Sequence, residues 1–239
     1  MEALILAAGF GRRLKPLTDE TPKPLLTISG VSLLEIVIRR LVASGVSSMV
    51  INTHHQAEKI ENFISQKSFG VPIQISHEKE ILETGGGLKN AERFFSGAAP
   101  FFIHNADVLS QVDLKSLYQR HLNSKNALAT LSVRKRETSR LLLFEEGRLC
   151  GIKREGQILS FSKTSRFEAL AFDGIQVVSP AIFPKIKETG KFSIIDLYLR
   201  LASEGEKIQA FSSDSFAWRD IGSPEGLLKA QREASFWSG

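Results

Sequence analysis

Cysteine is almost absent from this chain, since Cys150 is the only one among its 239 residues. A lone cysteine cannot form an internal disulfide, and its rarity suits a reducing compartment, so we expect the protein in the cytoplasm. No spacing of histidine and cysteine resembles a zinc site. Cys150 has no evident partner for nucleophilic chemistry, and we interpret it as a packing residue.

Long apolar runs are absent as well. No stretch approaches the roughly 18 residues of a membrane-spanning helix, and the apolar segment after Glu2 is too short for a signal peptide. The net charge is +5, but no aromatic residue is interleaved with the basic cluster Arg134, Lys135, Arg136 and Arg140, as base stacking would require. We therefore expect no membrane and no nucleic-acid partner, and we interpret this cluster as a solvated surface or a subunit contact.

The composition that remains is that of one large globular domain over residues 1–239, with 42% apolar and 24% charged residues. In the first half, strand-like segments alternate with helix-like ones. A capping box at Ser32 and Glu35 opens a helix that runs to about Ser44. This alternation predicts an α/β fold, a Rossmann-like and mostly parallel sheet flanked by helices. The expected strands are 3–8, 48–53, 72–76 and 101–104, and further helices are expected at 56–67 and from Gly87 to Phe95.

The second half has a different pattern, because its strand-like segments are short and separated by turns. They predict a small mixed or antiparallel sheet layered on the first. Asp113, Ser193 and Ser223 are expected to cap helices. The expected strands of this half are 126–134, 140–145, 148–153, 157–163, 170–178, 207–212 and 216–219.

The most informative segment follows the first expected strand. It continues through a glycine turn, Gly9-Phe10-Gly11, into Arg12 and Arg13, with Lys23 further on between two prolines. Glycines let backbone amides approach a ligand closely, and successive amides form a concave anion site. The dinucleotide fingerprint would need a third glycine where Leu14 stands, and the Walker motif is absent. The segment therefore predicts a different polyphosphate cradle, built from the amides of residues 8–11 and these cations.

Two acids each follow a short apolar strand: Asp107 ends the segment Phe101-Phe102-Ile103-His104-Asn105-Ala106-Asp107, and Asp220 ends Ala217-Trp218-Arg219-Asp220. In open α/β sheets, ligands bind at the carboxyl ends of strands. Mg²⁺ is held in proteins by one or two carboxylates together with substrate phosphates. We predict that Asp107 and Asp220 hold Mg²⁺; for Asp107 alone, a cap of the following turn is the alternative.

Together, the glycine turn with Arg13 and Lys23, the segment Asn105-Ala106-Asp107 and the segment Trp218-Arg219-Asp220-Ile221-Gly222 resemble the motifs of the sugar-1-phosphate nucleotidyltransferases. Leu82-Glu83-Thr84-Gly85-Gly86-Gly87-Leu88 is similar to that family's loop for the base and ribose. Its Glu-Thr-Gly-Gly-Gly form is most similar to the N-acetylmuramate-1-phosphate uridylyltransferases. The resemblance implies a nucleotide-binding set of Ala8, Gly9, Gly11, Glu83, Gly85 and Gly86.

The resemblance also implies a sugar side. Phe172-Asp173-Gly174-Ile175 resembles the segment where the sugar ring lies, which makes Asp173 and Gly174 sugar-phosphate-binding candidates. Lys163 takes the place of the family's lysine for the sugar phosphate, although Ser162 and Thr164 replace the glutamate and proline around it. Residues 1–125 would then be the nucleotide-binding half and 126–239 the sugar-phosphate-binding half of one nucleotidyltransferase domain.

The implied reaction transfers a nucleotidyl group from an NTP, expected to be UTP, to a sugar 1-phosphate, with N-acetylmuramate 1-phosphate as the candidate acceptor. The products are an NDP-sugar and pyrophosphate, Mg²⁺ is the cofactor, and Arg13 and Lys23 have the catalytic roles. One alternative is guanylyl transfer to mannose or heptose 1-phosphate. Another is a catalytically silent regulatory domain that binds nucleotide sugars. We expect a monomer or a homodimer.

Overall fold

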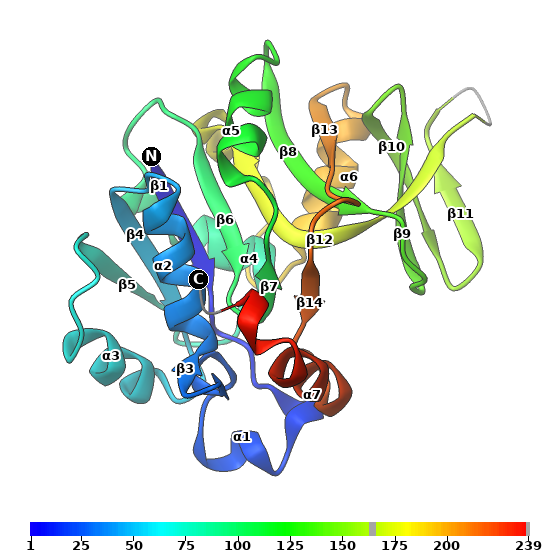
Figure 1. The fold of residues 1–239 in the computed structure, drawn as a ribbon. Helices are drawn as coiled ribbons and strands as arrows, with labels where there is room; N and C mark the ends of the chain where they lie inside the picture. The colour runs from blue at the N-terminus through cyan, green and yellow to red at the C-terminus, as the bar shows by residue number, and fades with distance from the viewer. Residues whose placement is uncertain (163–165, 238–239) are drawn as a thin grey trace.

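A computed structural model describes residues 1–162 and 166–237. Its centre is a ten-stranded mixed sheet in the order β11-β10-β13-β8-β12-β6-β1-β4-β5, with β9 paired to β10 and β12 (Figure 1). Four strands of the first half run parallel and end at the same edge of the sheet. They are β1 (Glu2–Leu6), β4 (Ser48–Thr53), β5 (Ile73–His77) and β6 (Phe101–Asn105).

The strands of the second half extend this sheet. Antiparallel pairing of β12 with β6 joins the halves, with Ile175 opposite His104, and β9, β10 and β11 turn away from the central strands (Figure 1). The α/β fold class is confirmed, whereas the expected layered sheet is in fact a continuation of the main one. The strands are β8 (Ala127–Arg134), β9 (Arg140–Glu145), β10 (Arg148–Arg154), β11 (Gln157–Ser160), β12 (Glu168–Val178) and β13 (Lys207–Ser212).

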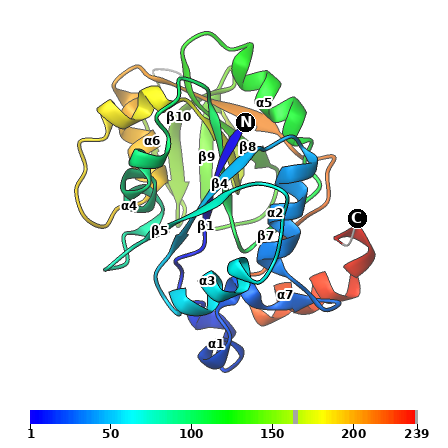
Figure 2. The same ribbon diagram turned by 90° about the vertical axis from the view of Figure 1, so that its left-hand side faces the viewer.

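Helices cover both faces of the sheet. In Figure 2, α4 (Glu83–Asn90) and α6 (Ile194–Ser203) lie on one side, and α2 (Leu33–Ala43) and α5 (Leu114–Leu122) lie on the other. Successive side chains of a strand point to opposite faces, so Leu4 of β1 packs with the α4–α6 core and Ile5 with the α2–α5 core. The α2–α5 side also includes α3 (Ala57–Ser65).

The helix starts follow the expected capping residues. The side chains of Ser32, Asp113, Ser193 and Ser223 each accept a hydrogen bond from a backbone N–H of the helix that follows. None of the helices in the described residues is both long and apolar enough to cross a membrane. The short 3₁₀ helices are η1 (Arg12–Leu14), η2 (Lys23–Leu25), η3 (Glu92–Phe94), η4 (Pro180–Lys185) and η5 (Ala234–Phe236).

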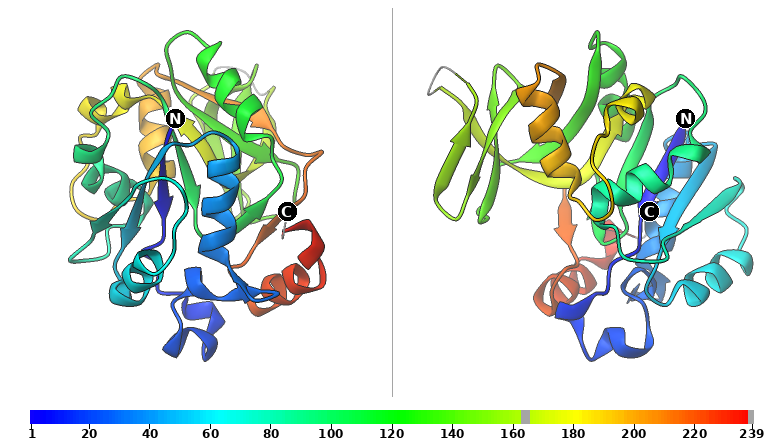
Figure 3. Two further views of the ribbon diagram at one scale, coloured as in Figure 1. Left: turned by 60° about the vertical axis from the view of Figure 1, so that its left-hand side comes forward. Right: turned by 180° about the vertical axis from the view of Figure 1, so that it is seen from behind.

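Two small sheets stand apart from the main one: β2 (Thr27–Ile28) with β3 (Val31–Ser32), and β7 (Val108–Ser110) with β14 (Trp218–Asp220). Helices α1 (Leu17–Glu20) and α7 (Pro224–Arg232) lie at the end of the molecule toward which the parallel strands point (Figure 3). A third apolar cluster, which includes Leu14, Leu26, Ile221 and Leu227, packs the first loop against the C-terminal segment. Residues from both ends of the chain therefore meet beyond the carboxyl ends of β1, β4 and β6.

Candidate active site

The loop after β1 has the backbone of an anion cradle. Gly11 has φ +64°, and a Cβ there would lie 2.9 Å from Cγ2 of Thr18, so a larger residue would be both strained and crowded. The Thr18 hydroxyl donates to the Gly11 carbonyl at 3.0 Å and holds the turn. Among the described residues, no acceptor takes the amide N–H groups of 8–11. These amides are available to a ligand.

Two adjoining cavities open beside this loop. The first, of about 380 Å³, is lined by Ala8 and Gly9 of the loop, by Asn105 and Asp107 after β6, and by Arg140. The second, of about 490 Å³, is lined by Phe10 to Arg13 together with Lys191 and Gly222. Lys23, Ile81 and Glu83 line both cavities. The first loop therefore lies between the two cavities, and Lys23 lines both of them.

The two predicted acids approach each other beside these cavities, of which Asp107 lines the first and Asp220 lines neither. In the β7–β14 ladder, Asp220 is opposite Val108, and the Ile221 N–H donates to the Asp107 carbonyl at 2.9 Å. The Asp107 carboxylate pairs with Lys23, a side chain only 10% exposed, and is itself 32% exposed. The described residues contain no group of three or more histidine, cysteine, aspartate or glutamate side chains suited to a metal. Two carboxylates fit a divalent cation whose other ligands are phosphate oxygens and water.

Arg13 reaches the same place from the first loop. A Cβ on Gly222 would lie 2.5 Å from Nη2 of Arg13 and 2.7 Å from Oδ1 of Asp220. The Gly222 N–H also donates to Oδ1 of Asp220 at 2.6 Å, which orients that carboxylate. The predicted catalytic residues Arg13 and Lys23 and both predicted metal ligands are therefore brought together from three distant segments.

The segment 82–88 differs from the expectation. The helix expected from Gly87 begins at Glu83, so the glycines lie inside α4. The N–H groups of Gly85 and Gly86 donate to the Phe192 carbonyl at 2.9 and 3.3 Å, and a Cβ on Gly85 would overlap the Phe192 ring. These glycines permit close packing of the 190–194 segment and line neither cavity, whereas Glu83 does.

Two buried polar residues that the sequence reasoning missed connect the first loop to α4. Asn52 accepts from the Ala7 N–H at 2.6 Å and donates to the Glu78 carboxylate at 2.6 Å. The other oxygen of Glu78 accepts from the Leu82 N–H at 2.9 Å. Burial raises the pKa of Glu78, and the hydrogen bonds from Leu82 and Asn52 oppose that shift. Asn52 directly follows the apolar run Met49-Val50-Ile51 inside β4, and this was the available signal.

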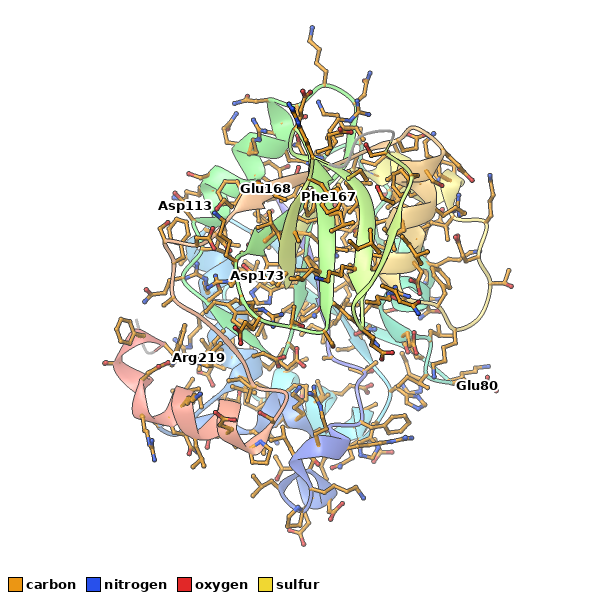
Figure 4. All side chains as sticks on the ribbon, turned by 90° about the vertical axis from the view of Figure 1, so that its right-hand side faces the viewer. Glu80, Asp113, Phe167, Glu168, Asp173 and Arg219 are labelled. Atoms are coloured by element: carbon orange, nitrogen blue, oxygen red, sulfur yellow. The ribbon has the colours of Figure 1, made fainter. Side chains whose placement is uncertain are left out.

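On the sugar side, Asp173 is a buried residue of β12, in the main sheet (Figure 4). Its carboxylate is fully buried and accepts from Ser132 at 3.0 Å, from Arg134 at 2.8 Å and from Ser213. Asp173 lines neither cavity, so a direct contact with the sugar stays a prediction without geometric support. Gly174, at φ +80°, packs against Asn105, which lines the first cavity. Lys163 lies outside the described residues.

The structure divides the basic cluster, which we expected to be a solvated surface or a subunit contact: Lys135 and Arg140 are exposed, whereas Arg134 and Arg136 are half-buried. Arg134 is 12% exposed and bound to Asp173, Arg136 lies 4.7 Å from the ring centre of Trp218, and Arg140 lines the first cavity. Burial lowers the pKa of Arg136, and the carboxylates of Asp173 and Asp220 act against that shift. The end of β8 and the residues just after it thus place two guanidinium groups over the Trp218 ring of β14, the strand that carries Asp220.

Known proteins share this arrangement of the chain. A family described as Nucleotidyl transferase matches residues 2–235. The D-glycero-alpha-D-manno-heptose 1-phosphate guanylyltransferase of Aneurinibacillus thermoaerophilus is 30% identical over 235 residues, which cover 98% of each chain. The N-acetylmuramate alpha-1-phosphate uridylyltransferase of Caulobacter vibrioides is 29% identical over 241 residues, 96% of this chain and 95% of the relative. A solved UDP-glucose pyrophosphorylase from Acinetobacter baumanii has the same fold, with a TM-score of 0.78 at 20% identity over 97% of this chain and 92% of that one.

Proposed function

The chain belongs to the nucleotidyl transferase family, and we propose that it transfers the uridylyl group of UTP to a sugar 1-phosphate with release of pyrophosphate. The family expected from the sequence motifs is thereby confirmed. Nucleotidyl transfer to a sugar 1-phosphate is the activity that its relatives share. Our proposal specifies uracil as the nucleotide base and N-acetylmuramate 1-phosphate as the first acceptor to test. It also places the reaction in the cytoplasm.

One observation carries the proposal: a loop with free amides, Arg13, Lys23 and Asp107 line two adjoining cavities. Asp220 lies beside them, at Gly222 and close to Arg13. A polyphosphate fits the amides and the guanidinium, because both are donors fixed in place before the ligand arrives. The base, the ribose and the sugar would then occupy the adjoining first cavity. The two cavities would let the acceptor phosphate approach the α-phosphate beside Lys23.

The reaction needs no general base from the protein. The second pKa of a phosphate monoester is near 6, so the attacking phosphate oxygen is already an anion at neutral pH. The remaining problem is electrostatic, because an anion must attack a polyanion in line. The amides of residues 8–11 and Arg13 would hold the β- and γ-phosphates. Lys23 would leave Asp107 and neutralise charge at the α-phosphate.

Asp107 and Asp220 would hold the divalent cation, which we expect to be Mg²⁺. When bound, such a cation orients the α-phosphate and spreads the charge that develops on the leaving pyrophosphate. The carboxylates fit this role because Asp107 is partly exposed to the first cavity and Asp220 is oriented by the Gly222 N–H. Substitution of either acid should therefore reduce turnover without disturbing the amide cradle.

Two other functions have specific support. Guanylyl transfer to a heptose or mannose 1-phosphate is supported by a heptose 1-phosphate guanylyltransferase that is 30% identical, against 29% for the uridylyltransferase. A regulatory domain that binds nucleotide sugars without turnover would share the cavities. The convergence of Lys23 with both acids argues for turnover.

A matrix of nucleotides against acceptors tests the proposal. UTP, dTTP, CTP, GTP and ATP are each combined with N-acetylmuramate, glucose, mannose and heptose 1-phosphates, and pyrophosphate release is measured. We expect the highest kcat/KM with UTP. A clear preference for GTP would establish the guanylyl alternative. Tight binding of nucleotide sugars with no pyrophosphate from any pair would identify the regulatory domain.

A further inference from the structure

The strand that carries Asp220 has little support of its own. β14 is three residues long, and among residues 1–162 and 166–237 it pairs with β7 alone, in a two-stranded sheet separate from the main one. A two-stranded sheet of this size is marginally stable in water by itself. The position of Asp220 must therefore depend on contacts outside this ladder. Those contacts include the burial of Ile221 in the third apolar cluster and the ion pair of Arg219 with Glu233. The contacts that reach strands of the main sheet are made by Trp218.

Trp218 is fixed from two directions. Its indole Nε1–H donates to the backbone carbonyl of Asp173 at 2.9 Å. Its ring has the guanidinium of Arg134 at 5.1 Å and that of Arg136 at 4.7 Å from the ring centre. Such cation–π contacts favour one placement of the ring. Both contacts connect β14 to the strands of the main sheet, β8 and β12.

Arg134 also holds the turn that leads into β14. Its Nη1 donates to the Phe216 carbonyl at 3.2 Å, and its Nη2 donates to the carbonyl and the hydroxyl of Ser213, each at 3.2 Å. The Ser213 N–H in turn donates to the Val133 carbonyl at 2.8 Å. One guanidinium therefore bonds to both ends of the segment 213–216.

Asp173 fixes Arg134 in this position. Its carboxylate accepts from Nε of Arg134 at 2.8 Å and from the hydroxyls of Ser132 and Ser213. All of these partners lie in or beside the main sheet, and the Asp173 side chain is fully buried. A buried carboxylate with three donors is tightly constrained, because any movement would leave a charge without a partner.

From these contacts we propose that Ser132, Arg134, Asp173 and Ser213, the Asp173 cluster, position Asp220 for the divalent cation. The inference rests on the proposed function, in which Asp220 is a ligand of that cation. Asp173 is then a positioning residue that never touches the sugar. Its effect reaches the site through Arg134, the 213–216 turn and Trp218.

Cation binding without nucleotide tests this role directly. Free Mn²⁺ is measured by electron paramagnetic resonance during titration of the protein. The main variant is the double substitution Arg134→Met with Asp173→Leu. It removes both buried charges together, and such replacements often leave stability unchanged. Ser213→Ala keeps both charges and removes one hydroxyl from the cluster. The matched control is Asp196→Asn, which breaks an Arg154–Asp196 ion pair in an exposed part of the chain.

We expect the double variant to fold and to bind Mn²⁺ about tenfold more weakly, and Ser213→Ala to bind about threefold more weakly. The control should bind as the wild type does. The chain has two tryptophans, so Trp237→Phe leaves Trp218 as the only tryptophan, whose emission is excited selectively at wavelengths that tyrosine does not absorb. In that background, the double substitution should expose Trp218 to acrylamide quenching and shift its emission to longer wavelength.

A folded double variant with wild-type Mn²⁺ affinity and unchanged Trp218 quenching would overturn the positioning role. If the double variant does not fold, unchanged Mn²⁺ affinity in Ser213→Ala would overturn it. Asp220→Asn separates this proposal from the one on which it rests. If Asp220→Asn binds Mn²⁺ as the wild type does, the metal pair itself is wrong. If only Asp220→Asn loses affinity, the metal pair stands and the Asp173 cluster has no part in it.

Discussion

Replacement of Lys23 by methionine should change cation binding and turnover in opposite directions. In the structure, the Lys23 ammonium forms an ion pair with the Asp107 carboxylate. We assign this carboxylate as a ligand of the divalent cation. The cation must compete with this ammonium in the free protein. During the reaction, the same ammonium is expected to neutralise the α-phosphate. Methionine keeps the apolar stem of Lys23 and removes only the charge.

The exposure of the pair sets the expected magnitude. Exposed ion pairs contribute about 1 kcal/mol or less, and loss of one partner from a fully buried pair costs about 3–5 kcal/mol. Lys23 is 10% exposed and Asp107 is 32% exposed, so we take about 1–2 kcal/mol for the attraction that the cation must displace. Removal of this competition should tighten Mn²⁺ binding roughly 5- to 30-fold, at about 1.4 kcal/mol per tenfold. Turnover should fall by about 10²-fold or more, the scale of one preorganised donor.

The assay pairs a Mn²⁺ titration without nucleotide with pyrophosphate release at saturating substrates. Lys187→Met is the matched control, because Lys187 is 72% exposed and pairs with Glu204 at 3.1 Å; it should change neither quantity. Weaker Mn²⁺ binding in Lys23→Met would contradict the competition that the structure indicates. Turnover within about threefold of wild type would refute the catalytic role, since that is a change of only about 0.7 kcal/mol.

Two further predictions concern stability. Gly85→Ala should lower the free energy of unfolding by about 1–3 kcal/mol, because the added Cβ overlaps the Phe192 ring; urea unfolding checks this, and Gly97→Ala, with its nearest atom 4.0 Å away, is the control. Burial lowers the pKa of His121 from 6.5 to about 4, so its unfolded form takes up a proton first and stability is lost as pH falls from 6.5 toward 4. Between pH 7 and pH 5, His121→Gln should lose about 1–2 kcal/mol less stability than the wild type. Equal losses in the two proteins would show that His121 does not titrate in this way.

Much of the fold was predictable because its signals are local. The parallel strands are apolar runs. Ser32, Asp113 and Ser193 are N-cap residues, whose side chains accept a hydrogen bond from a backbone N–H no more than three residues later. The meeting of Asp107 and Asp220 was predictable only in part, from the acid at the end of each apolar strand. The two strands do not share a sheet, because Asp107 follows β6 of the main sheet and Asp220 ends β14 of a separate sheet, and it is the antiparallel β7–β14 pairing that brings the acids together.

The parts that were not predictable depend on partners far along the chain. The sequence around Gly85 and Gly86 predicts a loop. In the structure these glycines lie in a helix and contact Phe192, which is more than a hundred residues later in the chain. Arg134 looked like a surface cation because Asp173 and Ser213 are not near it in sequence. Asn52 of β4 donates a hydrogen bond to Glu78, the residue that follows the neighbouring strand β5. A helix propensity or a charge run carries no information about such contacts.

Pyrophosphate release with and without EDTA, for the wild type, Asp107→Asn and Asp220→Asn, tests the central claim most directly. The account predicts that the wild type releases pyrophosphate from an NTP and a sugar 1-phosphate, that EDTA abolishes this activity, and that both variants fold but lose most of it. Excess Mg²⁺ should restore the variants only in part, because a neutral amide oxygen binds the ion more weakly than a carboxylate. Full wild-type activity in EDTA, or unchanged activity in both variants, would contradict the account.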